Sequence, residues 1–172
     1  MHVVIATDGK IATEDAITYA VPLADDGKVT VLTAVMVPRN LLSDLRAIFG
    51  EQPSVNVDTD GEYVAGGAGT GSGPTGWPGD DAIIDRYLSD KRDERCKPVE
   101  TALVEHGTEA ESVVIEGTNA AKVILEFIAT HDVDAVLVGT HGQGLFEGLL
   151  GSTSTRVARH ASCAVVLVPS KR

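Results

Sequence analysis

Cysteine, basic residues and long apolar runs are scarce in this sequence, and each scarcity excludes a class of protein. The chain has two cysteines, Cys96 and Cys163, which are far apart and match no metal-ligand spacing. A disulfide-stabilised secreted protein is therefore not expected, and a reducing cytoplasm is the expected location. No apolar run approaches the ~20 residues that a membrane-spanning helix needs. The N-terminus has no basic region before its first apolar run, so no signal peptide is predicted.

Positive charge is the second scarcity. The chain has 14 Lys and Arg residues against 25 Asp and Glu residues, which gives a formal net charge of −11. Such a charge argues against a nucleic-acid backbone or an anionic membrane as partner. An anionic ligand would have to be held by local backbone geometry, because the overall field repels it. Two interpretations of the acidity remain open: adaptation to a high-salt cytoplasm, and the ordinary composition of an acidic protein.

Signature motifs of the common nucleotide-binding and hydrolytic folds are missing from the positions where they would act. The turn after the first apolar run, residues 8–12, reads DGKIA and contains neither the dinucleotide fingerprint GxGxxG nor an SGGxDS-like pyrophosphatase loop. Neither a P-loop, GxxxxGK[ST], nor a nucleophile elbow, GxSxG, occurs. The five histidines form no H-x-H or HExxH pair, so no structural zinc site is predicted.

Five apolar runs, rich in Val, Ile and Leu, alternate with segments of helical periodicity along the 172 residues. Runs that are apolar throughout are typical of strands buried on both faces of a parallel sheet. The expected strands are residues 3–6, 29–37, 112–116, 135–138 and 164–168. The alternation predicts an α/β protein, with a doubly wound five-stranded parallel sheet and helices on both faces.

Residues 38–79 interrupt the alternation after the second strand. Residues 41–49 have the spacing of a short amphipathic helix, whereas residues 61–79 contain eight glycines and two prolines. The glycine-rich composition buries too little apolar surface to offset its ordering entropy. We interpret 38–79 as a flexible insertion within a single domain of residues 1–172, because neither flank alone forms a complete sheet.

Glycine is also concentrated after the fourth expected strand. Gly139 ends that strand, and a loop leads to Gly151 and to Ser152, the expected N-cap of the next helix. Glycine lets the backbone approach an anion, and a helix N-terminus offers unpaired N–H groups. Asp8 lies at the carboxyl end of the first strand, the edge of a doubly wound sheet where ligands bind. Together these positions predict a phosphate-binding crevice between the first and fourth strands.

Five segments of the sequence resemble the universal stress protein family. They are VVIATDG at 3–9, VTVLTAV at 29–35, VIEGTNAAKVI at 114–124, VLVGTHG at 136–142 and LLGSTSTRVARHASCAVVLVP at 149–169. The resemblance covers most of the chain, apart from the 38–79 insertion. It implies an adenine-nucleotide-binding α/β domain of flavodoxin-like layout.

The nucleotide-binding branch of that family carries the pattern G-x2-G-x9-G-[S/T], whose glycines and hydroxyl residue hold the phosphates of ATP. The resemblance implies this role for Gly139, Thr140, Gly142, Gly151, Ser152 and Thr153. It further implies that Asp8 lies near the ribose and metal, and that the main chain around Ala34 and Val35 meets the adenine. The spacing departs from the pattern, because eight residues rather than nine separate Gly142 from Gly151.

The sequence leaves more than one function open. The first is an ATP-binding, nucleotide-responsive stress regulator, with Mg²⁺ arriving on the nucleotide and with slow or no hydrolysis, since no nucleophile is paired with a general base. The second is a dimeric interaction module with an empty pocket, which the shortened loop favours. The third is an enzyme on a related fold, such as a nucleotidyl transferase or a flavin-binding electron carrier.

The last expected strand, residues 164–168, is strongly apolar and should lie at a sheet edge. An unpaired apolar edge is an aggregation liability. The resemblance implies that this strand pairs with its twin in a homodimer.

Overall fold

The computed structural model describes residues 1–49, 79–140 and 150–170. They belong to two compact units, one formed by Met1–Val37 with Asp85–Arg172 and the other by Pro38–Ile84. Within the described ranges, no helix combines the length and the apolar character needed to cross a membrane. The glycine-rich part of the predicted insertion lies outside the described residues.

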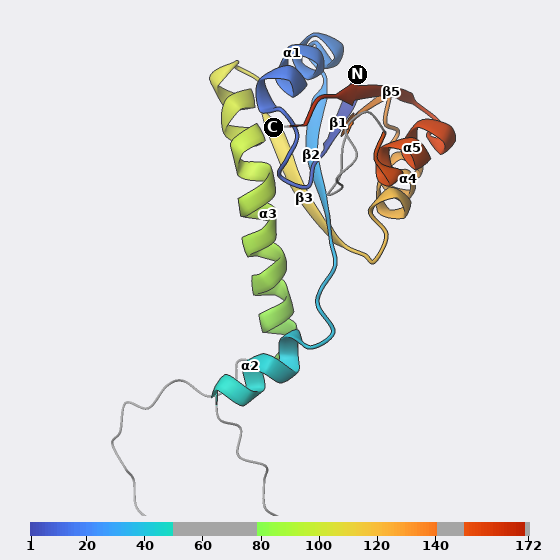
Figure 1. Ribbon diagram of the computed structural model, residues 1–172. Helices are drawn as coiled ribbons and strands as arrows, with labels where there is room; N and C mark the ends of the chain where they lie inside the picture. Colours follow the sequence, from blue (N-terminus) through green and yellow to red (C-terminus); the bar gives the residue numbers. More distant parts are fainter. Residues whose placement is uncertain (50–78, 141–149, 171–172) are drawn as a thin grey trace, which may run out of the picture. The chain divides into compact units, whose positions relative to one another are not determined.

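A five-stranded, all-parallel sheet forms the centre of the larger unit (Figure 1). Its strands are β1 (His2–Ala6), β2 (Lys28–Val35), β3 (Ala110–Glu116), β4 (Ala135–Gly139) and β5 (Ala164–Val168). Their spatial order is β3-β2-β1-β4-β5, so the order reverses between β1 and β4. The predicted doubly wound α/β sheet is confirmed, and each expected strand end lies within two residues of the observed one.

Successive residues of the inner strands belong to two different apolar clusters, one on each face of the sheet. In β1, Val3 and Ile5 belong to one cluster, while Val4 and Ala6 belong to the other, and none is more than 7% exposed. Successive side chains of a strand point to opposite faces, so both faces of β1 are covered. This double burial explains why residues 3–6 of β1 are apolar at every position and not only at alternate ones.

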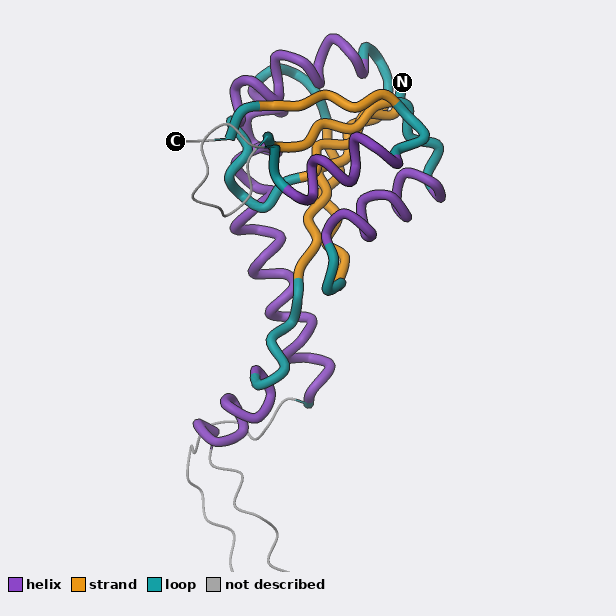
Figure 2. The backbone as a smooth tube through the Cα atoms, turned by 45° about the vertical axis from the view of Figure 1, so that its right-hand side comes forward, coloured by secondary structure: helices purple, strands orange, loops and turns teal. Residues whose placement is uncertain are grey.

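Helices cover both faces of the sheet (Figure 2). The helices α1 (Thr13–Ala24) and α3 (Asp80–Glu105) contribute to the cluster around Ile5, whereas α4 (Ala120–Thr130) and α5 (Ser152–His160) contribute to the cluster around Val4. The predicted two-sided covering is therefore confirmed. It leaves the carboxyl ends of β1, β2 and β4 bordered by α4 and α5, which positions the site described below.

Helix α3 continues through Pro98 to Glu105. A proline inside a helix removes one hydrogen bond and costs about 3 kcal/mol. Beyond the proline, Val99 and Leu103 are at most 2% exposed in the core. Burying each of these side chains contributes about 1.5–3 kcal/mol, so their packing offsets the cost and keeps this segment helical.

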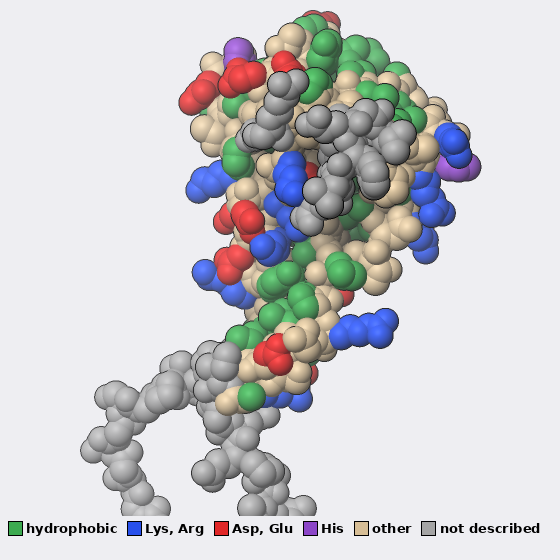
Figure 3. Space-filling view, in the orientation of Figure 1, with side chains coloured by type: hydrophobic (Ala, Val, Ile, Leu, Met, Phe, Trp, Pro, Cys, Tyr) green, Lys and Arg blue, Asp and Glu red, His purple; other side chains and the backbone are tan. Residues whose placement is uncertain are grey.

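Charged side chains of both signs lie over the surface of α3 (Figure 3). Three ion pairs lie along it: Arg86 with Asp90, Lys91 with Glu94, and Arg92 with Asp93. Such exposed pairs contribute about 0–1 kcal/mol each. They form a solvated helix face and not a binding site.

The smaller unit contains α2 (Leu41–Phe49), which confirms the short helix predicted for residues 41–49. Within this unit, the guanidinium of Arg46 donates to the carboxylate of Asp80 across 2.6 Å. The prediction of a single domain over residues 1–172, with a flexible insertion, stays a prediction.

Candidate functional site

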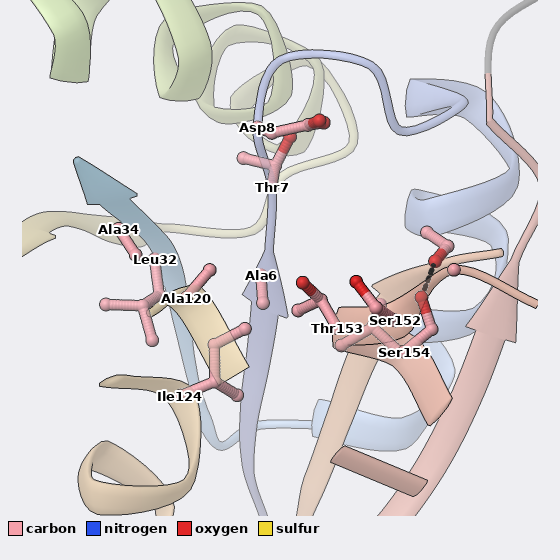
Figure 4. A pocket seen from close by; sticks show the side chains of 13 residues that line it. Ala6, Thr7, Asp8, Leu32, Ala34, Ala120, Ile124, Ser152, Thr153 and Ser154 are labelled. Carbon is pink, nitrogen blue, oxygen red and sulfur yellow. Dashed lines mark hydrogen bonds between the residues drawn. The ribbon is translucent and has the colours of Figure 1, made fainter. Parts of the chain in front are cut away.

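A cavity of about 250 Å³ opens at the carboxyl ends of β1, β2 and β4 (Figure 4). It is lined by Ala6, Thr7, Asp8, Leu32, Ala34, Ala120, Ile124, Val138, Gly139, Gly151, Ser152, Thr153 and Ser154. These residues come from the three strand ends and from the first turns of α4 and α5. The cavity thus lies at the switch point of the sheet, where ligands of doubly wound folds bind.

The two ends of the cavity differ in chemistry. Leu32, Ala120 and Ile124 gather on one side, where they present apolar surface (Figure 4). Ser152 and Thr153 face them from the other side with their hydroxyl groups. The arrangement suits a ligand that is apolar at one end and polar or anionic at the other.

The polar end is the N-terminus of α5. Gly151 is the N-cap, and the first intrahelical bond runs from the N–H of Thr155 to the Gly151 carbonyl at 2.8 Å. The backbone N–H groups of Ser152, Thr153 and Ser154 therefore precede the hydrogen-bonded turns, and none has an acceptor within the described ranges. Three free donors and the positive end of the helix dipole favour an anion here.

Two hydrogen bonds join this helix start to the end of β4, and a third joins the end of β4 to β5. The N–H of Gly151 donates to the Thr140 carbonyl at 2.8 Å, and the N–H of Thr140 donates to the Val168 carbonyl at 2.8 Å. The hydroxyl of Ser154 donates to the Gly139 carbonyl, the bond dashed in Figure 4. The donors at the polar end are thus held in place before any ligand arrives.

Asp8 lies at the end of β1, above the cavity (Figure 4). Its Oδ1 accepts the N–H of Lys10 at 3.1 Å, and Thr7 Oγ1 accepts the N–H of Gly9 at 2.9 Å. Gly9 has a φ of +91°, a backbone conformation that favours glycine. The Asp8 carboxylate therefore closes the turn through one oxygen. Its second oxygen has no hydrogen-bond donor among the described residues, and the side chain is exposed.

The predicted site residues are brought together to different degrees. Asp8, Ala34, Gly139, Gly151, Ser152 and Thr153 line the cavity. Val35 and Thr140 do not line it. The Val35 carbonyl accepts the N–H of Gly117, and the Thr140 carbonyl accepts the N–H of Gly151. Gly142 lies outside the described residues.

Ser152 is not the N-cap that the sequence suggested. Gly151 takes that position, and Ser152 is the first helical residue. The interpretation of Ser152 as the cap was wrong because it relied on residue type, whereas the Gly151 carbonyl already accepts the first intrahelical bond, from the N–H of Thr155. The Ser152 side chain is exposed, and its hydroxyl has no hydrogen-bond partner among the described residues, so it is available to a ligand.

Several lining residues were missed by the sequence reasoning. Leu32, Ala120 and Ile124 belong to ordinary apolar patterns, which carry no signal that distinguishes pocket from core. Ser154 could have been suspected, since it follows two hydroxyl residues in the first turn of a helix. Within the described ranges, no cluster of three or more potential metal ligands occurs.

The sequence is similar to known universal stress proteins. Over 87 aligned residues it is 32% identical to a universal stress protein of Methanocaldococcus jannaschii. The alignment covers 50% of this chain and 51% of that relative, so it spans about half the length of the curated relative.

Two solved structures show a similar fold. One, a universal stress protein family protein of Arabidopsis thaliana with AMP bound, has a TM-score of 0.54 at 14% identity and covers 98% of this chain and 91% of its own. The other is the universal stress protein of Archaeoglobus fulgidus in complex with dAMP. It has a TM-score of 0.53 at 18% identity, and the match covers 98% of this chain and 97% of that chain. At such identities the likeness shows the fold alone.

The family description that matches this sequence extends over nearly the whole chain. Residues 1–169 match the universal stress protein family. The match includes every strand of the sheet and all residues that line the cavity. The chain therefore belongs to the universal stress protein family.

Proposed function

We propose that this protein binds an adenine nucleotide in the cavity between β1 and β4 and acts as a nucleotide-responsive stress regulator. The observation that carries the proposal is the two-ended cavity, with apolar surface facing three N–H groups at the start of α5 for which the described residues provide no acceptor. A nucleotide has the matching shape, with a flat base at one end and phosphate at the other. The AMP and dAMP bound by two structurally similar proteins agree with this choice.

The proposed roles follow the two ends of the cavity. The N–H and hydroxyl groups of Ser152 and Thr153 would hold phosphate oxygens, and Gly139 and Gly151 would let the phosphate come close to the backbone. Asp8 would lie near the ribose, with one carboxylate oxygen free for a hydroxyl or for nucleotide-bound Mg²⁺. ATP is the proposed physiological ligand.

We propose regulation and not dedicated catalysis. Asp8 is the only titratable side chain among the described residues that line the cavity, and no nucleophile lies beside a general base there. Slow hydrolysis at most is expected. The free thiols of Cys96 and Cys163 agree with the proposed cytoplasmic location.

Titration calorimetry with ATP and Mg²⁺ tests the proposal directly. The variant Thr153→Glu places a carboxylate at the phosphate end, where it repels the ligand but suits the helix dipole, so the fold is retained. We expect it to weaken ATP binding at least tenfold. Thr155→Glu adds the same charge to the same helix outside the cavity lining and should change binding much less. Absence of binding to the unmodified protein at millimolar ATP would contradict the proposal.

The alternative is a dimeric interaction module with an empty pocket, which the eight-residue spacing between Gly142 and Gly151 favours. Purified protein separates the two functions. Adenine absorbance in material released on denaturation supports the nucleotide-binding regulator. Protein that carries no nucleotide and binds none supports the interaction module.

A further inference from the structure

The cavity has two polar walls, which come from segments far apart in the sequence. One wall is the turn after β1, which carries Asp8, and the other is the start of α5, with Ser152 and Thr153. A ligand that contacts both walls depends on the distance between them. An element that is hydrogen-bonded toward both walls sets that distance.

The end of β5 is such an element. The carbonyl of Val168 accepts the N–H of Thr140 at 2.8 Å, and the Thr140 carbonyl accepts the N–H of Gly151, the N-cap of α5. The next carbonyl, that of Pro169, accepts the N–H of Ala12 at 2.9 Å. Consecutive carbonyls of an extended chain point in opposite directions, so one strand end can hold two separate elements.

The turn that carries Asp8 has little else to hold it from outside. The N–H groups of Gly9 and Lys10 donate to side chains of the turn itself. Among the N–H groups of residues 8–12, that of Ala12 is the one for which the described part of the chain provides an acceptor outside the turn. The bond to Pro169 is therefore the main-chain attachment of this wall.

Packing supports the same attachment. Ile11, the residue before Ala12, forms an isolated antiparallel bridge with Ser170. The Ile11 side chain is buried in the apolar cluster that also contains Val168. Figure 1 shows the chain running from the end of β5 to the beginning of α1.

We propose that the hydrogen bond from Ala12 to Pro169 positions Asp8 for the ligand, an inference that rests on the proposed nucleotide binding. With the bond formed, the Asp8 carboxylate is held at a fixed distance from the N–H groups of α5, so a nucleotide reaches both walls at once. With the bond broken, the turn moves relative to a helix start that Val168 still holds. Ala12 does not line the cavity, so it is a positioning residue that acts through Asp8.

The variant Ala12→Pro removes the donated N–H without straining the backbone. Ala12 has a φ of −68° and is the N-cap of α1, so proline, which requires about −65°, fits there and interrupts no bond within the helix. Thr13→Pro is the matched control. It places proline at the first helical position, which favours proline, and the described residues provide no acceptor for the Thr13 N–H.

Titration calorimetry of the full chain with ATP and Mg²⁺ measures the effect. Ala12→Pro should weaken binding about three- to tenfold, the size of one hydrogen bond, and Thr13→Pro should change it less than about twofold. The decisive comparison repeats Ala12→Pro in an Asp8→Asn background. Asparagine keeps an Oδ1 acceptor for the N–H of Lys10 but removes the carboxylate. Ala12→Pro should then change binding less than about twofold, because the group that it positions is gone.

An equal loss in the two backgrounds would overturn the inference, because the proline would then act on the fold and not through Asp8. Unchanged binding in either Ala12→Pro or Asp8→Asn would also overturn it. Absence of ATP binding to the unmodified protein would overturn the proposed function as well. The two failures are therefore distinguishable.

Hydrogen exchange of the unmodified protein decides the matter if Ala12→Pro does not fold. If breaking the Ala12 bond weakens ATP binding, then bound ATP must disfavour breaking that bond by the same factor. Saturating ATP should therefore raise the protection of the Ala12 amide about three- to tenfold more than that of the Lys28 amide. Lys28 donates to the Met1 carbonyl at the amino end of β2, away from the cavity. Equal increases for the two amides would overturn the inference.

Discussion

Ser154 illustrates how a single buried hydroxyl organises the polar end of the cavity. The residue is 4% exposed, and its Oγ donates to the carbonyl of Gly139 at the end of β4. Both residues line the cavity. This bond therefore couples the position of the α5 N-terminus to the strand that carries the glycine.

Replacing Ser154 with Ala should destabilise the protein by about 1–2 kcal/mol, because the Gly139 carbonyl loses its side-chain donor in a largely buried position. Equilibrium unfolding in urea measures the loss. Ser152→Ala, two residues earlier in the same helix, should change the free energy of unfolding by less than about 0.5 kcal/mol, because Ser152 is exposed and its hydroxyl has no partner among the described residues. Equal losses in the two variants would contradict the assigned role of Ser154.

The thiol of Cys96 is fully buried between α3 and the sheet. Burial raises the pKa of Cys96 from about 9 to about 12. Between about pH 9 and pH 12 the thiol therefore stays protonated in the folded protein but ionises in the unfolded chain. The folded state therefore loses stability as the pH rises from about 9 toward 12.

Above pH 9, the unmodified protein should lose stability relative to Cys96→Ala by up to about 1.4 kcal/mol per pH unit. The substitution itself leaves a small cavity, whose cost is the same at every pH and cancels in the comparison. Urea unfolding of both proteins between pH 7 and 10.5 gives the two slopes. Parallel pH dependences would show that Cys96 titrates normally and is not enclosed as described.

At the scale of elements, α4 begins with a capped N-terminus. The Asn119 side chain accepts the N–H of Lys122 at 3.0 Å, whereas the neighbouring Thr118 is exposed and makes no such bond. Asn119→Ala should cost about 1 kcal/mol of unfolding free energy, measured by thermal or urea unfolding. Thr118→Ala should lower the free energy of unfolding by about 0.3 kcal/mol at most. A larger loss for Thr118→Ala than for Asn119→Ala would mean that Thr118 is the cap.

The edge strand β5 is the element on which assembly depends. β5 pairs on one side with β4, and Leu167 is 40% exposed. We propose that this strand pairs with its twin in a homodimer, because an apolar open edge is otherwise an aggregation liability.

Sedimentation equilibrium should show a dimer at micromolar concentration, and Leu167→Lys should weaken the dimer at least tenfold by placing like charges close together. Val104→Lys, at a 63% exposed position on α3, is the control and should leave the dimer intact. A monomeric unmodified protein would exclude the proposed pairing.

At the scale of the whole molecule, the formal charge of −11 is the dominant feature. Like charges repel one another within the folded state, and salt screens that repulsion within a Debye length of about 10 Å at 0.1 M. The exposed ion pairs that salt also weakens contribute little. Thermal unfolding in 50 mM and 1 M NaCl should therefore show a midpoint that rises with salt. A midpoint that falls would show that the ion pairs outweigh the net repulsion.

Most of the sheet could be predicted from the sequence, because strands buried on two faces form mainly apolar runs rather than an alternation of apolar and polar residues. Of the six predicted residues that line the cavity, Asp8, Gly139, Gly151 and Ser152 could be identified from residue type and position, because parallel topology brings strand ends and helix starts together. Ala34 and Thr153 were implied only by the family resemblance. Residues such as Leu32 and Ile124 could not be identified. An apolar side chain looks the same in the sequence whether it faces a cavity or another apolar side chain.

The sequence by itself determined which segments form strands, that the sheet is parallel, and that glycine and hydroxyl residues meet Asp8 at its carboxyl edge. These properties depend on local periodicity and on residue type. The contact between Arg95 and the Ala34 carbonyl, which joins residues 61 positions apart, was decided only by the tertiary structure. In the sequence Arg95 is one charge in a charged helix segment. Packing against the sheet turns this one arginine inward, so that it bonds to the carbonyl that β1 leaves unpaired.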